Sequence, residues 1–346
     1  MEPTPFVRPK QHHLRTLRDQ FERLRTTTVP PINVLDHLTT APTLMRLPNM
    51  YLLTLLGSAV GFHLFLYFIS VGYALGIALP VAAALWQFRR SLTISSSSLL
   101  VVLWGLRSAS FFLWREYVNW PALHHKIVQV HQQSSPSIGV QILCWLLYSF
   151  MYLCMLSPCW FRLEHNRAGP LHGLGLLLQL TGLGLESVAD WQKSAFKTGQ
   201  RYAWCHSGLW KYSTHPNYAG EWLFWTGTLL GGPTMSILET MLMLAGWIFI
   251  SVVLRGAVAS LDRKQSEKYG TMSEFVDFVE RYGVFGPRWK QWKEWAQQSK
   301  EWSIAFVTTR LRKRELPAES EAVTDSIDTA SGTAPEPPSD ETAREA

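Results

Sequence analysis

Charged side chains recur with helical spacing between residues 186 and 197. Glu186, Asp190, Lys193 and Lys197 are separated by four, three and four residues, which places them on one face of a helix. Glu186 still lies within an apolar run, where a carboxylate is costly and by default has a function. One interpretation is a polar stripe that faces water and is tied by ion pairs between turns. The other is a binding site, in which the inner carboxylates accept hydrogen bonds from ribose hydroxyls and the outer lysines hold phosphates.

A second polar group stands where the next apolar run begins. Thr214 or His215 is a suitable N-cap, with Pro216 at the first helical position. The free backbone N–H groups of such a helix start, beside Lys211 and His215, suit an anion such as phosphate.

Asn217 and Glu221 follow four residues apart, on one face of this new helix. A capped amphipathic helix start would explain the asparagine. Because Glu221 continues into an apolar span, where a carboxylate is expensive, the pattern favours a functional site.

Arg107 lies in the middle of a further apolar run, LWGLRSASFFLWRE. A guanidinium there needs a carboxylate, a carbonyl or a ligand phosphate as its partner. An internal ion pair with Glu186 and a contact to a ligand phosphate both remain open. Arg115, followed by Glu116, is expected to mark the membrane interface.

These residues are embedded in a chain whose composition indicates a membrane protein. Of its 346 residues, 47% are hydrophobic and 17% charged, whereas soluble chains carry about 25% charge. The 42 residues between Arg46 and Arg89 contain no Asp, Glu, Lys or Arg. This excludes a soluble globular enzyme and predicts an all-α, polytopic membrane helix bundle.

We expect about seven transmembrane spans, because a spanning helix needs about 20 apolar residues. Glycine and proline allow a turn near Ser70–Gly72, and Gly173, Gly175, Gly182 and Gly184 offer a small-residue surface for helix packing. The basic loop 190–218 favours the cytoplasmic side. The predicted spans are 50–69, 72–88, 97–115, 138–157, 171–188, 219–232 and 236–254.

The rest of the chain divides around this membrane domain, which we place at 47–290 with its motif core at 170–270. Residues 1–46 form a polar segment in which Leu14, Leu17, Phe21 and Leu24 share the face of an amphipathic helix. Residues 291–314 are predicted as a basic helical extension. Residues 315–346 hold nine acids and one base, a charge of −8, and are predicted to be a disordered tail.

Two classes of ligand are not expected. The four cysteines (Cys144, Cys154, Cys159 and Cys205) have no metal-binding spacing. The basic residues are scattered over loops rather than gathered on one face, which argues against nucleic-acid binding.

Four segments resemble the DUF1295 branch of the steroid 5α-reductase superfamily. GLWKYSTHPNYAGE at 208–221 is similar to its signature G-L-W-x-Y-S-R-H-P-N-Y-x-G-E, and LESVADWQKSAFK at 185–197 is similar to its E-x-x-A-D-x-Q-x-x-x-F-K segment. LWGLR at 103–107 resembles its L-W-x-x-R element, and LRGAVASLDRKQSEKYG at 254–270 its closing helix. The resemblance covers roughly residues 95–290.

The resemblance implies a multi-span reductase of the endoplasmic reticulum membrane, acting in lipid metabolism. It would hold NADPH in a cavity open to the cytosol and take a lipid-like substrate from the bilayer. By position, Glu186 and Asp190 fall on ribose or adenosine contacts, Lys197 on a phosphate contact, Asn217 on a cofactor contact and Glu221 beside nicotinamide and substrate. The other residues expected at the cofactor site are Arg107, Lys211, Tyr212, His215, Arg255, Asp262, Lys264 and Tyr269.

Reduction of an enone requires hydride at its β-carbon and an acid at its carbonyl oxygen. Tyr218 and Glu221 are the candidate catalytic residues, because a tyrosine hydroxyl or a carboxylic acid kept protonated by an apolar site can donate that proton.

The sequence departs from the signature at two places and leaves two other functions open. Thr214 stands where the family has arginine, and Asp262 where it has glutamate. One alternative is an S-adenosylmethionine-dependent membrane methyltransferase of the isoprenylcysteine or phospholipid type, whose proteins share an R-H-P-x-Y-x-G element. The segment 186–197 and the pair Asn217 and Glu221 resemble the reductase pattern and favour the reductase instead. The other alternative, suggested by Thr214, is a non-catalytic member of the fold.

Overall fold

The structure is a computed structural model that describes residues 47–233, 236–290 and 293. The chain divides into two compact units, Met1–Gly286 and Pro287–Ala346. The helices named below all belong to the first unit. The predicted N-terminal amphipathic helix, nearly all of the basic extension and the acidic tail lie outside the described residues.

The first half of the described chain is helical with one irregular corner. The first apolar run forms a short helix and two turns of 3₁₀-helix, and a π-helical turn, η4, continues the second long helix before the chain bends. In order, these elements are α3 (Leu47–Ser58), η2 (Ala59–Phe62), η3 (Phe65–Ile69), α4 (Val71–Phe88), α5 (Leu92–Trp114), η4 (Arg115–Asn119), α6 (Pro121–Ser134) and α7 (Ile138–His165).

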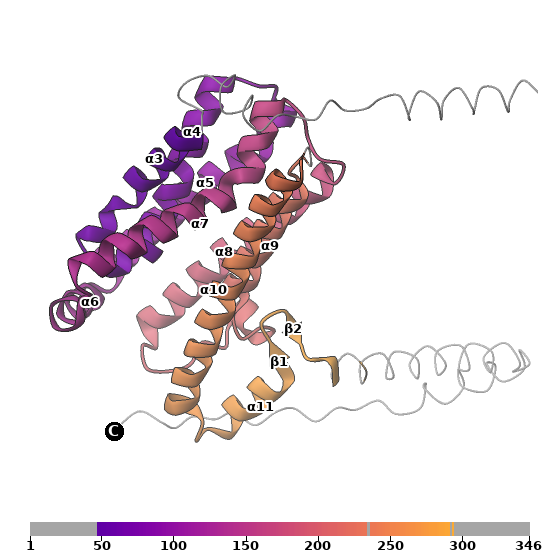
Figure 1. Ribbon diagram of the computed structural model, residues 1–346. Helices are drawn as coiled ribbons and strands as arrows, with labels where there is room; N and C mark the ends of the chain where they lie inside the picture. The colour runs from indigo at the N-terminus through magenta and orange to yellow at the C-terminus, as the bar shows by residue number, and fades with distance from the viewer. Residues whose placement is uncertain (1–46, 234–235, 291–292, 294–346) are drawn as a thin grey trace, which may run out of the picture. The chain divides into compact units, whose positions relative to one another are not determined.

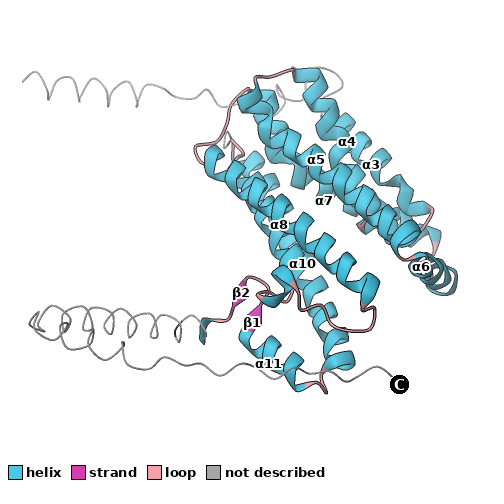
Figure 2. Ribbon diagram, turned by 180° about the vertical axis from the view of Figure 1, so that it is seen from behind, coloured by secondary structure: helices cyan, strands magenta, loops and turns pink. Residues whose placement is uncertain are grey.

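The second half contains the helices that carry the motifs, followed by a small hairpin. In order, these elements are α8 (His172–Gly199), η5 (Gly208–Lys211), α9 (Pro216–Leu230), α10 (Ile237–Tyr269), α11 (Ser273–Arg281), β1 (Tyr282–Gly283) and β2 (Gly286–Pro287). Figure 1 and Figure 2 show that α8, α9 and α10 run side by side. The predicted all-α class is confirmed.

Within the described residues, four helices are long and apolar enough to cross a membrane: Val71–Phe88, Leu92–Asn119, Ile138–His165 and Ile237–Tyr269. The predicted number of seven spans is not confirmed. The first predicted span is helical only as the shorter apolar stretch Leu47–Phe62, α9 has 15 residues, and α8 carries charged residues along its second half.

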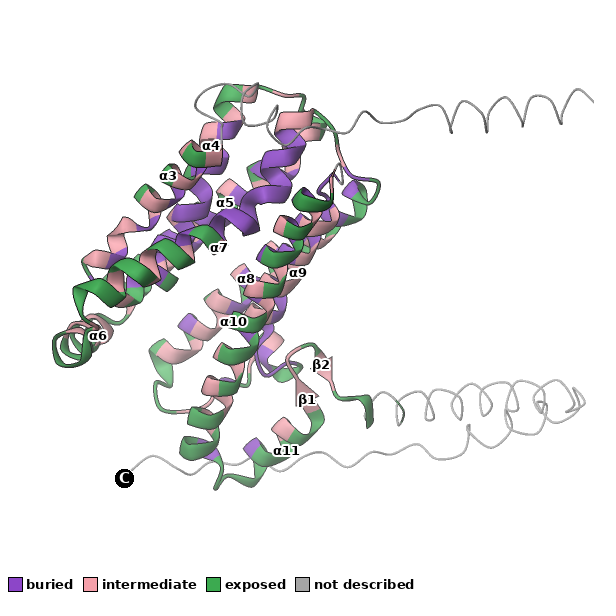
Figure 3. Ribbon diagram, viewed as in Figure 1, coloured by how far each residue is buried: buried purple, intermediate pink, exposed green. Residues whose placement is uncertain are grey.

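The core lies between α4, α5 and α7, with aromatic side chains from α9 closing it. Trp104 of α5 stacks on Phe224 of α9, with ring centroids 5.7 Å apart. The buried faces of these helices point toward one another in Figure 3, whereas α6 and the part of α7 before Ser149 contain only intermediate and exposed residues. Exposed apolar residues at this end of α7, such as Leu143 and Leu147, suit a surface that faces lipid.

Glycines set the close approach of α8 to α9. A Cβ added to Gly182 would lie 2.5 Å from the carbonyl oxygen of Gly220, and one added to Gly220 would lie 2.6 Å from the backbone nitrogen of Glu186. The predicted packing surface is therefore confirmed for Gly182 and Gly175, but Gly173 and Gly184 have no atom within 4 Å of such a Cβ. This contact brings Glu186 next to the turn of α9 that carries Glu221.

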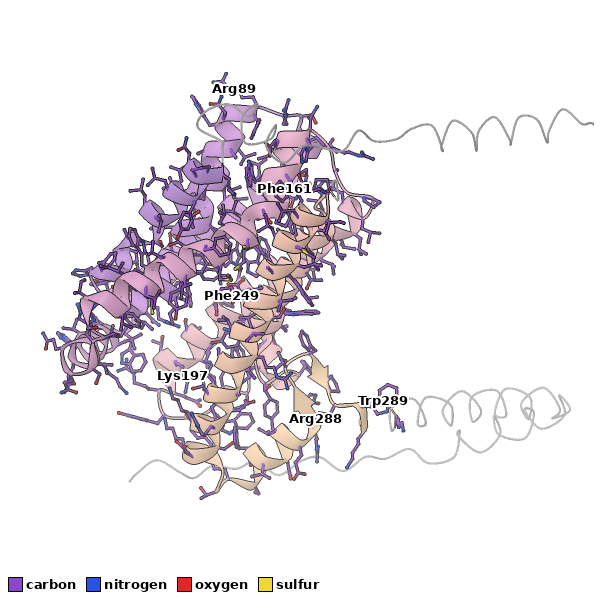
Figure 4. The ribbon with its side chains drawn as sticks, viewed as in Figure 1. Arg89, Phe161, Lys197, Phe249, Arg288 and Trp289 are labelled. Carbon is purple, nitrogen blue, oxygen red and sulfur yellow. The ribbon has the colours of Figure 1, made fainter. Side chains whose placement is uncertain are left out.

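Helix α10 is about 50 Å long at 1.5 Å per residue and has two chemically different parts. Its apolar part, Ile237–Leu254, is about 27 Å long, close to the hydrocarbon thickness of a bilayer. Its charged part, from Arg255 to Tyr269, therefore continues beyond that thickness. The last turns of α8 and the start of α9 lie at the same end, and Figure 4 shows Lys197 at the opposite end of the molecule from Arg89.

Candidate functional site

A cavity of about 550 Å³ opens at this end of the unit, between the end of α5, α6, α8, α9 and α10. We call it the basic cavity. Its walls combine aromatic and aliphatic side chains with charged groups and one amide. They are formed by Phe111, Arg115, Asn119, Trp120, Leu123, Asp190, Lys193, Ser194, Lys197, Thr198, Arg201, Asn217, Tyr218, Leu261 and Lys268.

Five of these lining residues are basic and one is acidic. In the described part of the chain, no ion pair joins any of the five basic groups to a carboxylate. Burial lowers the pKa of Lys193 to about 8, and its ammonium group lies 4.3 Å from the centre of the Trp210 ring. A cavity with this excess of positive charge suits a ligand that carries several phosphates.

Arg107 is the centre of a hydrogen-bonded network behind the cavity. Its Nη1 donates to Glu186 Oε1 at 2.6 Å, and its Nη2 donates to Asp190 Oδ2 at 2.5 Å. Trp104 Nε1 donates to the second oxygen of Glu186 at 3.0 Å. Of the two interpretations left open for Arg107, the internal ion pair is therefore the one seen in the structure.

Asp190 links this network to the cavity wall. Its Oδ1 accepts a hydrogen bond from Asn217 Nδ2 at 3.2 Å, while its other oxygen binds Arg107. Burial raises the pKa of Asp190, and the Arg107 guanidinium opposes that rise. Asn217 keeps its own Oδ1 buried without a hydrogen-bond partner in the described residues.

Glu221 lies one turn beyond Asn217 and Tyr218 on α9 and has a partner that the sequence did not indicate. Tyr73 of α4 donates from its hydroxyl to Glu221 Oε1 at 3.0 Å. Tyr73 is buried, and its ring lies 5.1 Å from that of Trp104. Tyr73 has no sequence signal of its own, because it stands in an uncharged run among other aromatic residues.

The start of the signature segment docks on α8. Gln192 Oε1 accepts a hydrogen bond from the backbone N–H of Leu209 at 2.8 Å, and Trp210 Nε1 donates to the carbonyl oxygen of Ala189 at 3.0 Å. Gly208 has φ +58°, and a Cβ there would meet the Gln192 side chain at 2.4 Å. Only glycine fits this turn, which seats η5 against the helix that carries Asp190 and Lys193.

His215 is the N-cap of α9 and Pro216 its first residue, as predicted. The His215 side chain is fully buried, and its Nε2 lies 2.7 Å from Asp262 Oδ1. Burial lowers the pKa of His215, and Asp262 opposes that fall. Thr214, at the family's arginine position, is buried and donates its backbone N–H to Gly283 at 3.1 Å. These two residues fasten the start of α9 to α10 and to the hairpin.

The cavity brings together only part of the predicted cofactor site. Asp190, Lys197, Asn217 and Tyr218 line it. Tyr269 is buried beneath Lys197, whose ammonium lies 6.0 Å from the ring centre. The predicted residues that are exposed and do not line the cavity are Lys211, Tyr212, Arg255 and Lys264.

Three cavity cations were not among the predicted binding residues: Arg115, Arg201 and Lys268. Arg115, expected at the membrane interface, lies in the π-helical turn η4. Arg201 lies in a loop and Lys268 at the end of α10. Both segments are rich in charge in the sequence, and this is the one signal that could have indicated these two residues. Among the described residues, no group of His, Cys, Asp and Glu is arranged to hold a metal ion.

Comparison with known proteins gives a family but no function. No curated protein and no solved structure matches this chain. The model of the family described as "Protein of unknown function (DUF1295)" matches residues 66–282. This match covers more than half of the chain and includes every element that forms the basic cavity. The predicted resemblance is thereby confirmed, and the chain belongs to the DUF1295 family.

Proposed function

We propose that this membrane protein is an NADPH-dependent reductase of a carbon–carbon double bond in a lipid or steroid-like enone, located in the endoplasmic reticulum. The observation that carries the proposal is the basic cavity, in which five cations unpaired with any described carboxylate share the wall with Asp190, which Arg107 links to the buried Glu186 behind it.

The residues of the cavity fit a phosphorylated dinucleotide. Its volume of about 550 Å³ is within the range of about 300–1,000 Å³ of ligand sites. Arg115, Lys193, Lys197, Arg201 and Lys268 would hold the phosphates. Asn217 Oδ1 would accept from a hydroxyl or an amide, and the rings of Phe111 and Trp120 would cover the apolar faces of the bases.

NADPH, when bound, would supply the hydride that reaches the β-carbon of the enone. The chain must then supply one proton to the carbonyl oxygen. Tyr218 lines the cavity and would donate this proton from its hydroxyl. Glu221, three residues further along α9, would replace the proton, and Tyr73 holds Glu221 Oε1 in place from the opposite helix.

The cations favour this reaction over methyl transfer. S-adenosylmethionine carries a positive sulfonium, a positive ammonium and a single carboxylate, so most of the five basic residues in the cavity would have no partner in it. A non-catalytic protein without a ligand would have no ligand anion for Lys193 and no hydrogen-bond donor for the buried Asn217 Oδ1. Charged and polar groups left without a partner lower the stability of the fold, which argues against this alternative.

The test is ligand-induced stabilisation of the purified protein. At 100 times its dissociation constant, NADPH should stabilise the fold by about 2.7 kcal/mol, which raises the melting temperature by about 5 °C for a chain of this size. Lys268→Ala should reduce this shift. Arg263→Ala is the matched control, because Arg263 is exposed on the same helix and does not line the cavity.

Tritium transfer gives the chemical readout. In isolated membranes, tritium from labelled NADPH should enter the lipid fraction, whereas methyl tritium from S-adenosylmethionine should not. Transfer from S-adenosylmethionine alone would establish the methyltransferase, and absence of any stabilisation by NADPH would refute the proposed cofactor.

A further inference from the structure

A second cavity, of about 420 Å³, lies between η3 and α6. We call it the apolar groove. Its principal walls are Phe65, Leu66 and Ile69 of η3 together with Ile127 and Val130 of α6. Its volume is also within the range of about 300–1,000 Å³ of ligand sites.

The apolar groove and the basic cavity are neighbours that share two wall residues, Trp120 and Leu123. Trp120 stands between η4 and α6, and the guanidinium of Arg201 lies 5.7 Å from the centre of its ring. A molecule long enough to pass Trp120 would therefore occupy both spaces, with an apolar part on one side and a part among the cations on the other.

The walls of the groove are exposed where a soluble protein would bury them. Leu66 is 43% exposed, Ile69 52% and Val130 54%. Helix α6 lies at the end of the group formed by α3, α4, α5 and α7, as both Figure 1 and Figure 2 show, and none of its residues is buried. Since these helices include three candidate membrane spans, α6 lies at the level of the membrane interface, where exposed aliphatic side chains contact lipid chains.

Specific polar contacts fix the two sides of the groove. His131 Nδ1 of α6 accepts a hydrogen bond from the backbone N–H of Phe65 at 3.3 Å. The buried Glu116 accepts a hydrogen bond from the Tyr67 hydroxyl at 2.9 Å, and its Oε1 lies 2.6 Å from His124 Nδ1 of α6. Both walls are therefore attached to the same carboxylate, Glu116 of η4, and the adjoining η4 residues Arg115 and Asn119 line the basic cavity.

The polar lining groups also suit an amphiphile at an interface. Lys126, His131, Ser134 and Ser135 all belong to α6 or to the turn after it. A lysine in this position can extend its amine to the headgroup region while its methylene groups cover the apolar wall.

From the exposed apolar walls and the two wall residues shared with the basic cavity, we propose that the apolar groove holds the hydrocarbon chain of a membrane lipid, whose polar, reducible end reaches past Trp120 into the basic cavity. The identity of that reducible end rests on the proposed function, whereas occupancy of the groove by a hydrocarbon chain does not.

The experiment is photolabelling of the full chain in lipid nanodiscs with a straight-chain alcohol that carries a diazirine in its chain and a terminal alkyne, followed by peptide mapping. Labels should map to residues 65–69 and 123–130. In competition with unlabelled alcohols, affinity should rise about fourfold for each added methylene until the groove is filled.

A tryptophan that fills the groove provides the variant test. Ile127→Trp should reduce labelling of residues 65–69 at least about tenfold. This is the loss of affinity expected when the indole ring prevents roughly two methylenes of the probe from being buried. Gln129→Trp is the matched control, because Gln129 is exposed on α6 and does not line the groove. Leu66→Trp tests the same space from η3 if Ile127→Trp does not fold.

The outcomes separate the two proposals. Labelling of the groove without stabilisation by NADPH would support the chain site and refute the proposed reductase. If NADPH stabilises the protein but neither segment is labelled, the proposed site for the hydrocarbon chain is overturned and the reductase proposal stands. The same holds if labelling is unchanged in both Ile127→Trp and Leu66→Trp. Labelling that appears only after deletion of residues 1–46 would show that this segment, and not a lipid, occupies the groove in the full chain.

Discussion

Arg107→Ala is expected to destabilise the folded protein by about 3 kcal/mol. Arg107 binds both Glu186 and Asp190, whose side chains are only 9% and 12% exposed. Removing one member of a buried ion pair costs about 3–5 kcal/mol, because the remaining charge stays buried without its partner. The Arg107 side chain is itself 23% exposed, so water can replace part of the lost interaction and the lower value applies.

The measurement is thermal unfolding followed with a thiol-reactive dye. Cys154 and Cys159 are free and buried in α7, so they react only when the bundle opens. A loss of 3 kcal/mol corresponds to a fall in melting temperature of about 6 °C. Arg115→Ala is the control, because Arg115 lines the cavity without an ion pair to a described carboxylate. It should change the melting temperature little and weaken NADPH binding instead.

A double-mutant cycle isolates the ion pair from the loss of packing. In a Glu186→Gln, Asp190→Asn background, the two charges are absent, and Arg107→Ala should cost at least about 1.5 kcal/mol less than in the natural protein. Equal costs in the two backgrounds would show that Arg107 acts through its packing on Phe111, and the electrostatic reasoning would then be wrong.

Three further predictions follow from the geometry. Gly182→Ala should destabilise the bundle by about 2 kcal/mol through overpacking against α9, whereas Gly184→Ala, with no atom within 4 Å of the added Cβ, should be neutral in the same melting assay. The affinity for NADPH should be constant between about pH 7 and pH 8, above the titration of the ligand's own phosphate near pH 6, and then fall by up to about tenfold per pH unit. Lys193, whose pKa is lowered to about 8, is protonated and able to bind phosphate below that pH and loses its charge above it. Lys193→Arg should remove this inflection, and a profile that stays flat above pH 8 in the natural protein would contradict the assignment. Tyr73→Phe should lower kcat of the reductase by about tenfold or more with unchanged NADPH affinity, because Tyr73 binds Glu221 and does not line the cavity; an equal loss of NADPH affinity would contradict this role.

The absence of charge over long runs was enough to predict the helical membrane class, because it follows from composition alone. The boundary of the first span was wrong for a local reason. Gly57 and Gly61 pack directly against Leu75 and Phe68, and the chain leaves the α-helix after Ser58 for two 3₁₀ turns. Close packing of this kind depends on a partner helix that local sequence does not specify.

The helical spacing of Glu186, Asp190, Lys193 and Lys197 predicted correctly that these residues share one side of α8. Arg115 in the cavity wall was not predicted, because it lies at the junction of α5 and η4, far from α8 in sequence, and only tertiary packing brings it to the same cavity. Lys211 and Tyr212, predicted at the cofactor site because they belong to the signature segment, are exposed at the end of η5 and do not line the basic cavity.

The carboxylates behind the basic cavity and the cations that line it lie in different electrostatic environments, and this difference bears on the kind of ligand the site would take. The carboxylates Glu186 and Asp190 are adjacent to the apolar layer and are compensated within the chain by Arg107. The cavity cations lie beyond the apolar part of α10 and have no such partner among the described carboxylates. The Lys193 ammonium, whose charge is made costly by burial, is stabilised within the chain by the Trp210 ring and the charge of Asp190, and an anion from outside would stabilise it further. Asp190 belongs to both groups. One of its oxygens binds Arg107, the other accepts a hydrogen bond from Asn217, and the two residues Asp190 and Asn217 line the cavity. A ligand with phosphates at one end and hydrogen-bond donors at the other, as in the proposed NADPH, would complement both halves at once, and this argument uses the charges of the site and not the family signature.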